Sequence, residues 1–273
     1  PPPELCAALE STLLIGSGTT TNHSVRDYAK LLRVGFLGLV KEVDEALTAC
    51  SMEDPQALER MCFLQAAQVI ARAGARLGRR YAEAAREAAR AAEDEPRRRE
   101  LETMASVCER VPAEPATTLH EAVQALWLGH TITCCEDHIN ANSLGRLDQI
   151  LQPYYEADRT AGRLDEEGAL ILLEHLYLKL YRDYDVQQAV LGGLTPDGHD
   201  ATCDMTYLCL EAARRLGLVR CMSVRLHRNT PTKLLRAGAE LVGKGGGIPF
   251  FFNDEAVIPA LEAKGIPSED ARD

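Results

Sequence analysis

The chain has 273 residues, of which 46% are hydrophobic and 26% are charged, proportions that are ordinary for one large or two modest globular domains. Its net charge of -11 argues against a nucleic-acid-binding protein, which needs clustered Lys and Arg. No segment approaches the roughly 20 apolar residues of a membrane span. The start, PPPE, lacks the basic and apolar regions of a signal peptide. We therefore expect a cytoplasmic protein that binds neither nucleic acid nor membrane.

The first half of the chain is predicted to be almost entirely helical. Apolar residues recur at three- and four-residue steps between positions 32 and 47, which predicts a helix with one buried face. Ala and Arg, which are strong helix formers, dominate residues 56–92. Pro96 suits the first turn of another helix, because its missing N–H has no partner to lose there. A further helix is expected near residues 119–129.

In the second half, strand-like and helical segments alternate. Acidic residues at 165–167 precede an apolar helical pattern and complement its dipole. Strand-like segments follow at 188–194, at 222–226 and, as a short buried strand, at 248–252. Helices are expected at about 202–216, from Pro231 to Gly243, and from Asp254 or Glu255 to near Gly265. This alternation favours an α/β layout with largely parallel strands.

Cysteine and histidine spacing indicates no metal site. The nine cysteines are scattered irregularly, and no two have the spacing of zinc or iron–sulfur ligands. The histidines share no helical or hairpin spacing. Most cysteines are therefore predicted to be small buried hydrophobic residues, and the adjacent pair Cys134 and Cys135 is assigned to packing.

Short motifs follow one another along the chain. They are HSVRDY at 23–28, NSLGRLDQ at 142–149 with PYY at 153–155 and Asp158, GG at 192–193 with DGHD at 197–200, SVRLH at 223–227, and GGGIPFFFNDE at 245–255. In these segments and their order, the chain resembles the pyruvate formate-lyase-like family of glycyl radical enzymes. Each motif alone is weak, but the ordered series covers nearly the whole chain and is specific.

The resemblance implies an α/β fold in which a helix-rich N-terminal region leads into half of a ten-stranded barrel. Residues 1–115 would form the mostly helical region and residues 116–273 the first part of the barrel, within one truncated domain. In this family, a glycyl radical passes to a cysteine whose thiyl abstracts hydrogen from the substrate. A separate radical S-adenosylmethionine (SAM) activating enzyme installs the radical. We expect that activase and a small-molecule substrate as partners, no cofactor bound by this chain, and a homodimer.

The implied function is that of a lyase or dehydratase that cleaves a C–C, C–O, C–N or C–S bond of a small polar metabolite. The family's catalytic cysteine and radical glycine lie beyond the segment that ends at Asp273. We therefore expect no catalytic residue of the radical reaction in this chain, and no activity from it alone. The alternative is a truncated, non-catalytic paralogue that acts as a binding or assembly subunit. Such a paralogue would be half a barrel with exposed strand edges, which promote aggregation unless a partner covers them. The enzyme is therefore the favoured interpretation.

Candidates for substrate contact are His23, Asp27, His138, Asn140 and His227. His23 and Asp27 can form a proton-transfer pair for a leaving hydroxyl or amine, or they can merely tether the loop; both interpretations stay open. His138 can line the pocket but fits the cap of a chain reversal better. Asn140 stands where diol dehydratases have a histidine, which argues against glycerol or propanediol as substrate. His227 ends a predicted strand, although buried histidines with satisfied hydrogen bonds are commoner there than site residues.

A second group of residues is expected to hold the barrel loops in place. These residues are Ser143, Gly145, Arg146, Asp148, Gln149, Asn253 and Asp254. Arg146 is expected to bind barrel carbonyls or a carboxylate in preference to substrate. Asn253 and Asp254 are expected to cap the following helix, since Asn and Asp are strong N-caps.

Overall fold

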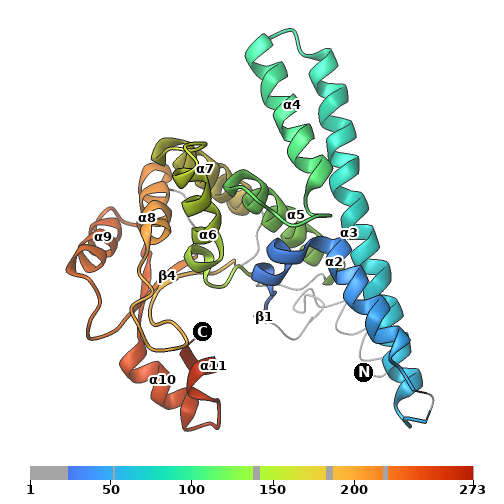
Figure 1. Ribbon diagram of the computed structural model, residues 1–273. Coiled ribbons are helices and arrows are strands. Elements are labelled where there is room, and N and C mark those ends of the chain that lie inside the picture. Colours follow the sequence, from blue (N-terminus) through green and yellow to red (C-terminus); the bar gives the residue numbers. More distant parts are fainter. Residues whose placement is uncertain (1–23, 52, 138–141, 183–186, 218–220, 273) are drawn as a thin grey trace, which may run out of the picture.

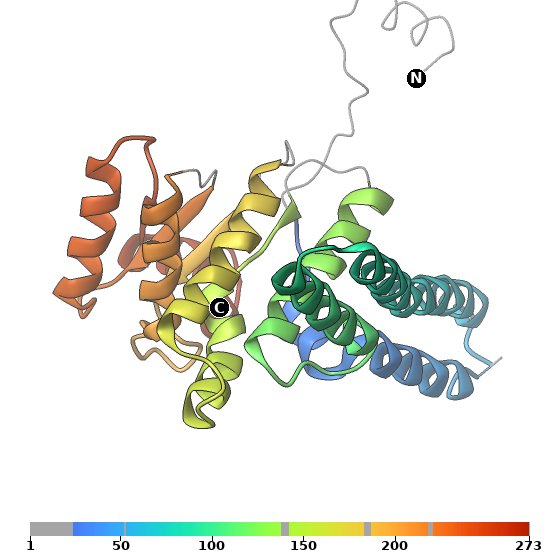
Figure 2. The same cartoon turned by 90° about the horizontal axis from the view of Figure 1, so that it is seen from above.

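The structure, a computed structural model, describes residues 24–51, 53–137, 142–182, 187–217 and 221–272. The chain forms two adjoining parts, a helical part from its first half and an α/β part from its second (Figures 1 and 2). No helix within the described ranges is long and apolar enough to cross a membrane.

The helical part consists of α2 (Tyr28–Thr48), α3 (Ala57–Ala91), α4 (Glu95–Arg110) and α5 (Leu119–Asp137). The hairpin of α3 and α4 projects away from the rest of the molecule (Figure 1). The buried face of α3 carries only Ala and Gly, at three- and four-residue steps from Ala71 to Ala89, so neighbouring helices can approach closely. The helix predicted at 56–92 is therefore confirmed.

Helix α2 is kinked at Gly35, which has φ 65° and ψ 171°. The linker between α4 and α5 lies in this kink, where the N–H groups of Phe36 and Leu37 donate to the carbonyls of Pro112 and Ala113 at 2.8 and 2.9 Å. A Cβ atom on Gly35 would lie 2.4 Å from the Ala113 oxygen. Only glycine fits both the backbone conformation and the space.

In the described ranges, the α/β part contains five short strands and the helices between and after them. The strands are β1 (Ser24–Val25), β2 (Asn142–Ser143), β3 (Ala189–Gly192), β4 (Met222–Leu226) and β5 (Phe250–Asn253). The helices are α6 (Leu147–Thr160), α7 (Glu166–Arg182), α8 (Asp204–Leu216), α9 (Thr232–Gly243), α10 (Asp254–Glu262) and α11 (Ser268–Arg272). The helix-rich α/β class expected from the sequence is confirmed.

The pairs among the described strands are all parallel, and they form a two-stranded sheet β1-β2 and a three-stranded sheet β3-β4-β5. A parallel bridge between Gly145 and Ala189 joins the two sheets, and the N–H of Val190 donates to the Gly145 carbonyl at 2.8 Å. The described strands therefore follow the spatial order β1-β2-β3-β4-β5.

The two faces of the three-stranded sheet have different neighbours. Leu191, Val224 and Phe251 are aligned in register on one face, where Gly238 of α9 leaves room for the Phe251 ring. Val190 and Arg225 belong to the opposite face, because side chains alternate along a strand. That opposite face lines a cavity.

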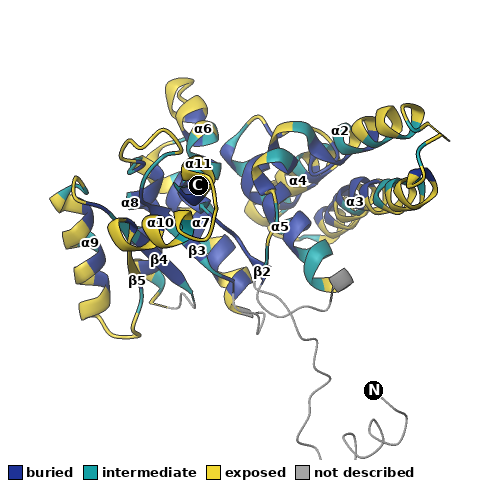
Figure 3. Cartoon of the chain, turned by 90° about the horizontal axis from the view of Figure 1, so that it is seen from below, coloured by how far each residue is buried: buried dark blue, intermediate teal, exposed yellow. Residues whose placement is uncertain are grey.

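Two expectations were wrong, and one helix was not predicted. The strand predicted to be buried at 248–252 is an exposed edge strand, and Phe250, Phe251 and Phe252 are 50, 42 and 49% exposed (Figure 3). Within the described residues, β5 pairs with β4 on one side and with no strand on the other. Apolar composition alone could not predict this position at the edge. Helix α6 was not predicted, although Leu147, Leu151 and Tyr155 form its buried stripe. Of the eight described cysteines, only Cys108 and Cys209 are buried.

Candidate functional site

A cavity of about 660 Å³ lies on the sheet face opposite α9. Residues that directly follow β1 and β2 form one wall, and α10 and α11 contribute another. Its polar lining includes Arg26, Asp27, Arg146, Gln149 and Arg225. These residues come from three of the motifs found in the sequence, which span some two hundred positions of the chain.

The turn after β2 brings two strands together at this cavity. Gly145 has φ 72°, and a Cβ atom on it would lie 2.8 Å from the Val25 side chain of β1. A larger residue would therefore push β1 away from β2. Ser143, two residues before Gly145, is buried and is the register partner of Val25.

Asp148, in the first turn of α6, is fully buried and accepts three hydrogen bonds. The donors are the N–H of Gly192 at 2.8 Å, the hydroxyl of Thr206 at 2.6 Å and the N–H of Gln149 at 2.8 Å. Burial raises the pKa of this carboxyl, and the hydrogen bonds oppose that rise. Asp148 thereby holds β3 and α8 against the start of α6.

Arg146 and Gln149, the neighbours of Asp148 in sequence, bind main-chain carbonyls of the segments around the cavity. The Arg146 guanidinium donates to the carbonyls of Gly192 at 3.0 Å and Arg272 at 3.2 Å. The Gln149 amide donates to the Ala201 carbonyl at 2.7 Å. The 142–149 motif therefore positions the chain around the cavity through main-chain contacts.

Arg225, which lines the cavity from β4, forms an ion pair with Asp254. Arg225 Nε lies 2.8 Å from Asp254 Oδ1, and their side chains are 11% and 1% exposed. Asp254 Oδ2 also accepts the N–H of Leu194 at 3.1 Å. Asn253 caps α10 by accepting the N–H of Glu255, whereas Asp254 connects β4 with the loop after β3. Sequence reasoning missed Arg225, although a charge inside an apolar strand was a visible signal.

His227 lies outside the large cavity. Its Nδ1 accepts the N–H of Asn229 at 3.3 Å, so Nε2 carries the proton and donates to Asp200 at 3.1 Å. The side chain is 2% exposed. His227 contributes to a separate cavity of about 320 Å³ beside Arg228 and Glu255. Its contacts join the end of β4 to the loop that precedes α8.

Asp27 is the one predicted substrate-contact residue that the structure places in the large cavity. Its Oδ1 accepts the N–H of Lys30 at 2.8 Å and so caps α2. His23, His138 and Asn140 lie outside the described residues. Among the residues that are described, no three His, Cys, Asp or Glu side chains gather closely enough to hold a metal ion.

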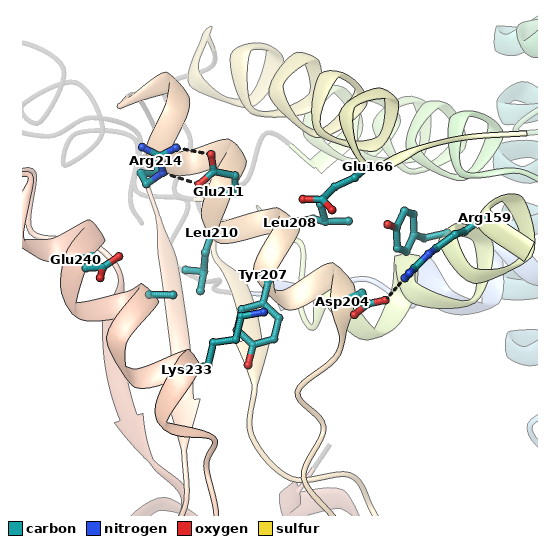
Figure 4. Close-up of a pocket in the computed structure, with 12 residues that line it drawn as sticks. Arg159, Glu166, Asp204, Tyr207, Leu208, Leu210, Glu211, Arg214, Lys233 and Glu240 are labelled. Atoms are coloured by element: carbon teal, nitrogen blue, oxygen red, sulfur yellow. Dashed lines mark hydrogen bonds and ion pairs between the residues drawn. The ribbon is translucent and has the colours of Figure 1, made fainter. Parts of the chain in front are cut away.

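A third cavity, of about 430 Å³, opens between α6, α8 and α9 (Figure 4). Its charged groups largely neutralise one another: Arg159 pairs with Asp204, Arg214 pairs with Glu211, and Lys233 lies 4.1 Å from the centre of the Tyr207 ring. None of the residues predicted from sequence line it. The 660 Å³ cavity is therefore the better candidate site.

Comparisons with known proteins give one consistent result. The pyruvate formate lyase-like family matches residues 2–273. Isethionate sulfite-lyase of Nitratidesulfovibrio vulgaris is 35% identical over 268 residues, which cover 91% of this chain and 32% of that protein. The glycerol-bound B12-independent glycerol dehydratase of Clostridium butyricum matches with a TM-score of 0.88 and 34% identity, over 93% of this chain and 34% of that one.

A glycyl radical enzyme from Archaeoglobus fulgidus also matches, with a TM-score of 0.86 and 30% identity, over 98% of this chain and 38% of that one. The chain spans about a third of the length of the curated relatives that it matches. Since the family match extends over nearly every residue, the chain belongs to the pyruvate formate lyase-like family of glycyl radical enzymes.

Proposed function

We propose that this chain forms the N-terminal portion of a glycyl radical lyase or dehydratase acting on a small polar metabolite. One observation carries the proposal: the motifs at 23–28, 142–149 and 223–227 all contribute side chains to a single cavity. Such convergence of distant polar residues on one cavity is typical of a substrate site. The thiyl cysteine and radical glycine of the reaction would come from outside this chain.

The order of the described strands supports the proposed architecture. Five parallel strands would form half of a ten-stranded barrel, with residues 1–115 as its helical periphery and 116–273 as its first part. The exposed β5 edge supports a further strand beside it. A radical SAM activase, a homodimeric assembly and a cytoplasmic location stay predictions from the sequence.

The cavity lining supports a substrate with several oxygen atoms. Arg26 brings a guanidinium group to it and Asp27 a carboxylate. The guanidinium groups of Arg146 and Arg225 also border it, where main-chain carbonyls and Asp254 hold them in place. Guanidinium groups suit carboxylate, sulfonate and hydroxyl oxygens. The names of two relatives indicate isethionate and glycerol, both small and rich in oxygen, as their substrates. The asparagine at position 140 argues against glycerol itself.

The proposal predicts a longer native protein that carries a radical. Protein isolated from its source should have an intact mass well above 29.9 kDa. After anaerobic incubation with a radical SAM activase and S-adenosylmethionine, it should show the electron paramagnetic resonance signal of a glycyl radical. A mass equal to that of this chain, with no radical, would instead support the non-catalytic binding subunit.

Asp27 offers a test of the site with a matched control. Asp27 and Asp94 both cap a helix by accepting the N–H three residues later, at 2.8 and 2.9 Å, but only Asp27 lines the cavity. Replacing either by Ala should cost about 1 kcal/mol of stability. In the complete activated enzyme, D27A should lower kcat/KM by about a hundredfold or more, and D94A should not. Equal activity of the two variants would show that Asp27 acts only as the N-cap of α2.

A further inference from the structure

A line of hydrogen bonds runs from α2 through α5 to β2. The Tyr28 hydroxyl lies 3.0 Å from His130 Nδ1, and His130 Nε2 lies 3.4 Å from Cys134 Sγ. The Asn142 amide nitrogen lies 3.7 Å from the same sulfur. His130 and Cys134 are four residues apart on α5 and therefore share one face of the helix.

We propose that Cys134 is a nucleophilic thiol, that His130 is its base, and that this pair reacts with soft carbon electrophiles. A nucleophile and a base within hydrogen-bond reach, with a third group that orients the base, form the arrangement that activates cysteine in enzymes. When Nδ1–H donates to the Tyr28 hydroxyl, the lone pair of Nε2 faces the thiol. His130 can then take the thiol proton.

Asn142 stabilises the sulfur once it has lost that proton. Its side-chain oxygen accepts a hydrogen bond from the Ser24 hydroxyl at 3.5 Å, which directs the amide N–H₂ group toward Cys134. The thiolate would thus accept hydrogen bonds from both the protonated His130 and Asn142. Donors held in place in this way stabilise charge as it develops.

Burial separates the base from water while leaving the nucleophile accessible. Tyr28, His130 and Asn142 are 2, 0 and 0% exposed, whereas Cys134 is partly exposed. In the reaction, sulfur forms a bond to the electrophilic carbon, the bond from carbon to the leaving group breaks, and the leaving group keeps the electron pair. The thiol proton passes to His130 Nε2. The radical chemistry proposed above needs none of these steps.

Alkylation by iodoacetamide at pH 7 tests the proposal, with each cysteine followed by peptide mass spectrometry. Cys135 is the next residue on the same helix and is exposed, so it serves as the internal control. We expect Cys134 to react about tenfold faster or more in the folded chain than in urea, because general-base assistance accelerates nucleophilic attack. Cys135 should gain no such acceleration. Slower reaction of Cys134 in the folded chain than in urea would overturn the proposal.

Two variants identify the source of the activation. Tyr28→Phe removes only the hydroxyl that orients His130, and His130→Gln removes the base. Both should bring the Cys134 rate down toward its value in urea and leave the Cys135 rate unchanged. If His130→Gln fails to fold, Tyr28→Phe carries the test, with its folding checked by the thermal transition. A Cys134 rate that is the same in a folded variant as in the parent chain would show that His130 is not its base.

Discussion

At the scale of single residues, Asp148 connects segments that lie far apart in the sequence. Its carboxylate bonds the N–H of Gly192, 44 positions away, and the hydroxyl of Thr206, 58 positions away. Removing a buried acceptor leaves its donors without a partner, which costs more than the hydrogen bonds contribute net. We therefore expect Asp148 to contribute to the stability of the fold rather than directly to the reaction.

Replacing Asp148 by Ala should lower the free energy of unfolding by about 3 kcal/mol, because two buried donors lose their acceptor. The midpoint of urea unfolding measures the loss. Glu166→Ala is a suitable control, since Glu166 is an exposed acid in the first turn of the next helix. That control should change stability by less than about 0.5 kcal/mol. Equal losses in the two variants would contradict the structural role of Asp148.

Arg228 and Glu255 form a second residue-scale contact, between the end of β4 and α10. Hydrogen bonds from the Arg228 side chain lower the pKa of Glu255 from 4.5 to about 2. Because the folded-state pKa is depressed, the stabilisation is present above the usual Glu pKa and is lost as pH falls toward 2. In Arg228→Gln, an NMR titration should find the Glu255 pKa raised from about 2 toward its usual value, while the main-chain N–H of residue 228, which also donates to Glu255, keeps part of the depression. A pKa that stays near 2 would assign the shift to another group.

At the scale of secondary-structure elements, the kink in α2 decides how the helical part packs. Helix α2 and the linker before α5 exchange hydrogen bonds at Gly35, and Ala116 donates its N–H to the Leu32 carbonyl at 2.9 Å. A straight helix would have no free carbonyl or N–H at that point. The kink therefore anchors the linker to α2.

Gly35→Ala should destabilise the chain by about 3 kcal/mol, because it combines a backbone conformation restricted to glycine with a steric clash. Gly162→Ala separates the two effects: Gly162 also has φ 65°, but nothing lies within 4 Å of its added Cβ. That variant should lose only about 1 kcal/mol. Urea unfolding of both variants provides the measurement. Equal losses would mean that contact with Ala113 plays no part.

At the scale of the whole molecule, the β5 edge is an exposed apolar surface in the described part of the chain. Three consecutive phenylalanines are exposed there (Figure 3), and Phe250 and Phe252 lie on the cavity face of the sheet. An apolar edge strand readily pairs with another strand. In solution, this chain is therefore expected to associate through β5 unless another strand covers the edge.

Phe252→Glu should reduce that self-association, because a charge on the edge opposes pairing. Light scattering coupled to size-exclusion chromatography would show a shift toward the mass of the monomer. Phe63→Glu introduces the same charge at an exposed phenylalanine on α3, 71% exposed, and should leave the association unchanged. If only Phe63→Glu yields monomer, the contact belongs to the helical part.

The sequence by itself determined those elements whose signal is local. The helix expected at 56–92 spans Ala57–Ala91, the strand expected at 222–226 has those bounds, and the helix from Pro231 ends at Gly243. Periodicity, proline and glycine act within a few residues, so they can be read without knowledge of the fold. The ordered motifs likewise identified the family.

Only the tertiary structure decided which side chains meet. The exposure of β5 depends on what lies beside it, and the ion pair of Arg225 with Asp254 depends on how β4 and α10 are arranged. The sequence assigned Cys134 to packing, and the contacts of its sulfur with Asn142 of β2 and of His130 with Tyr28 of α2 came only from the structure. Contacts between distant segments arise from parallel strand pairing and helix packing, which bring together residues that no local pattern relates.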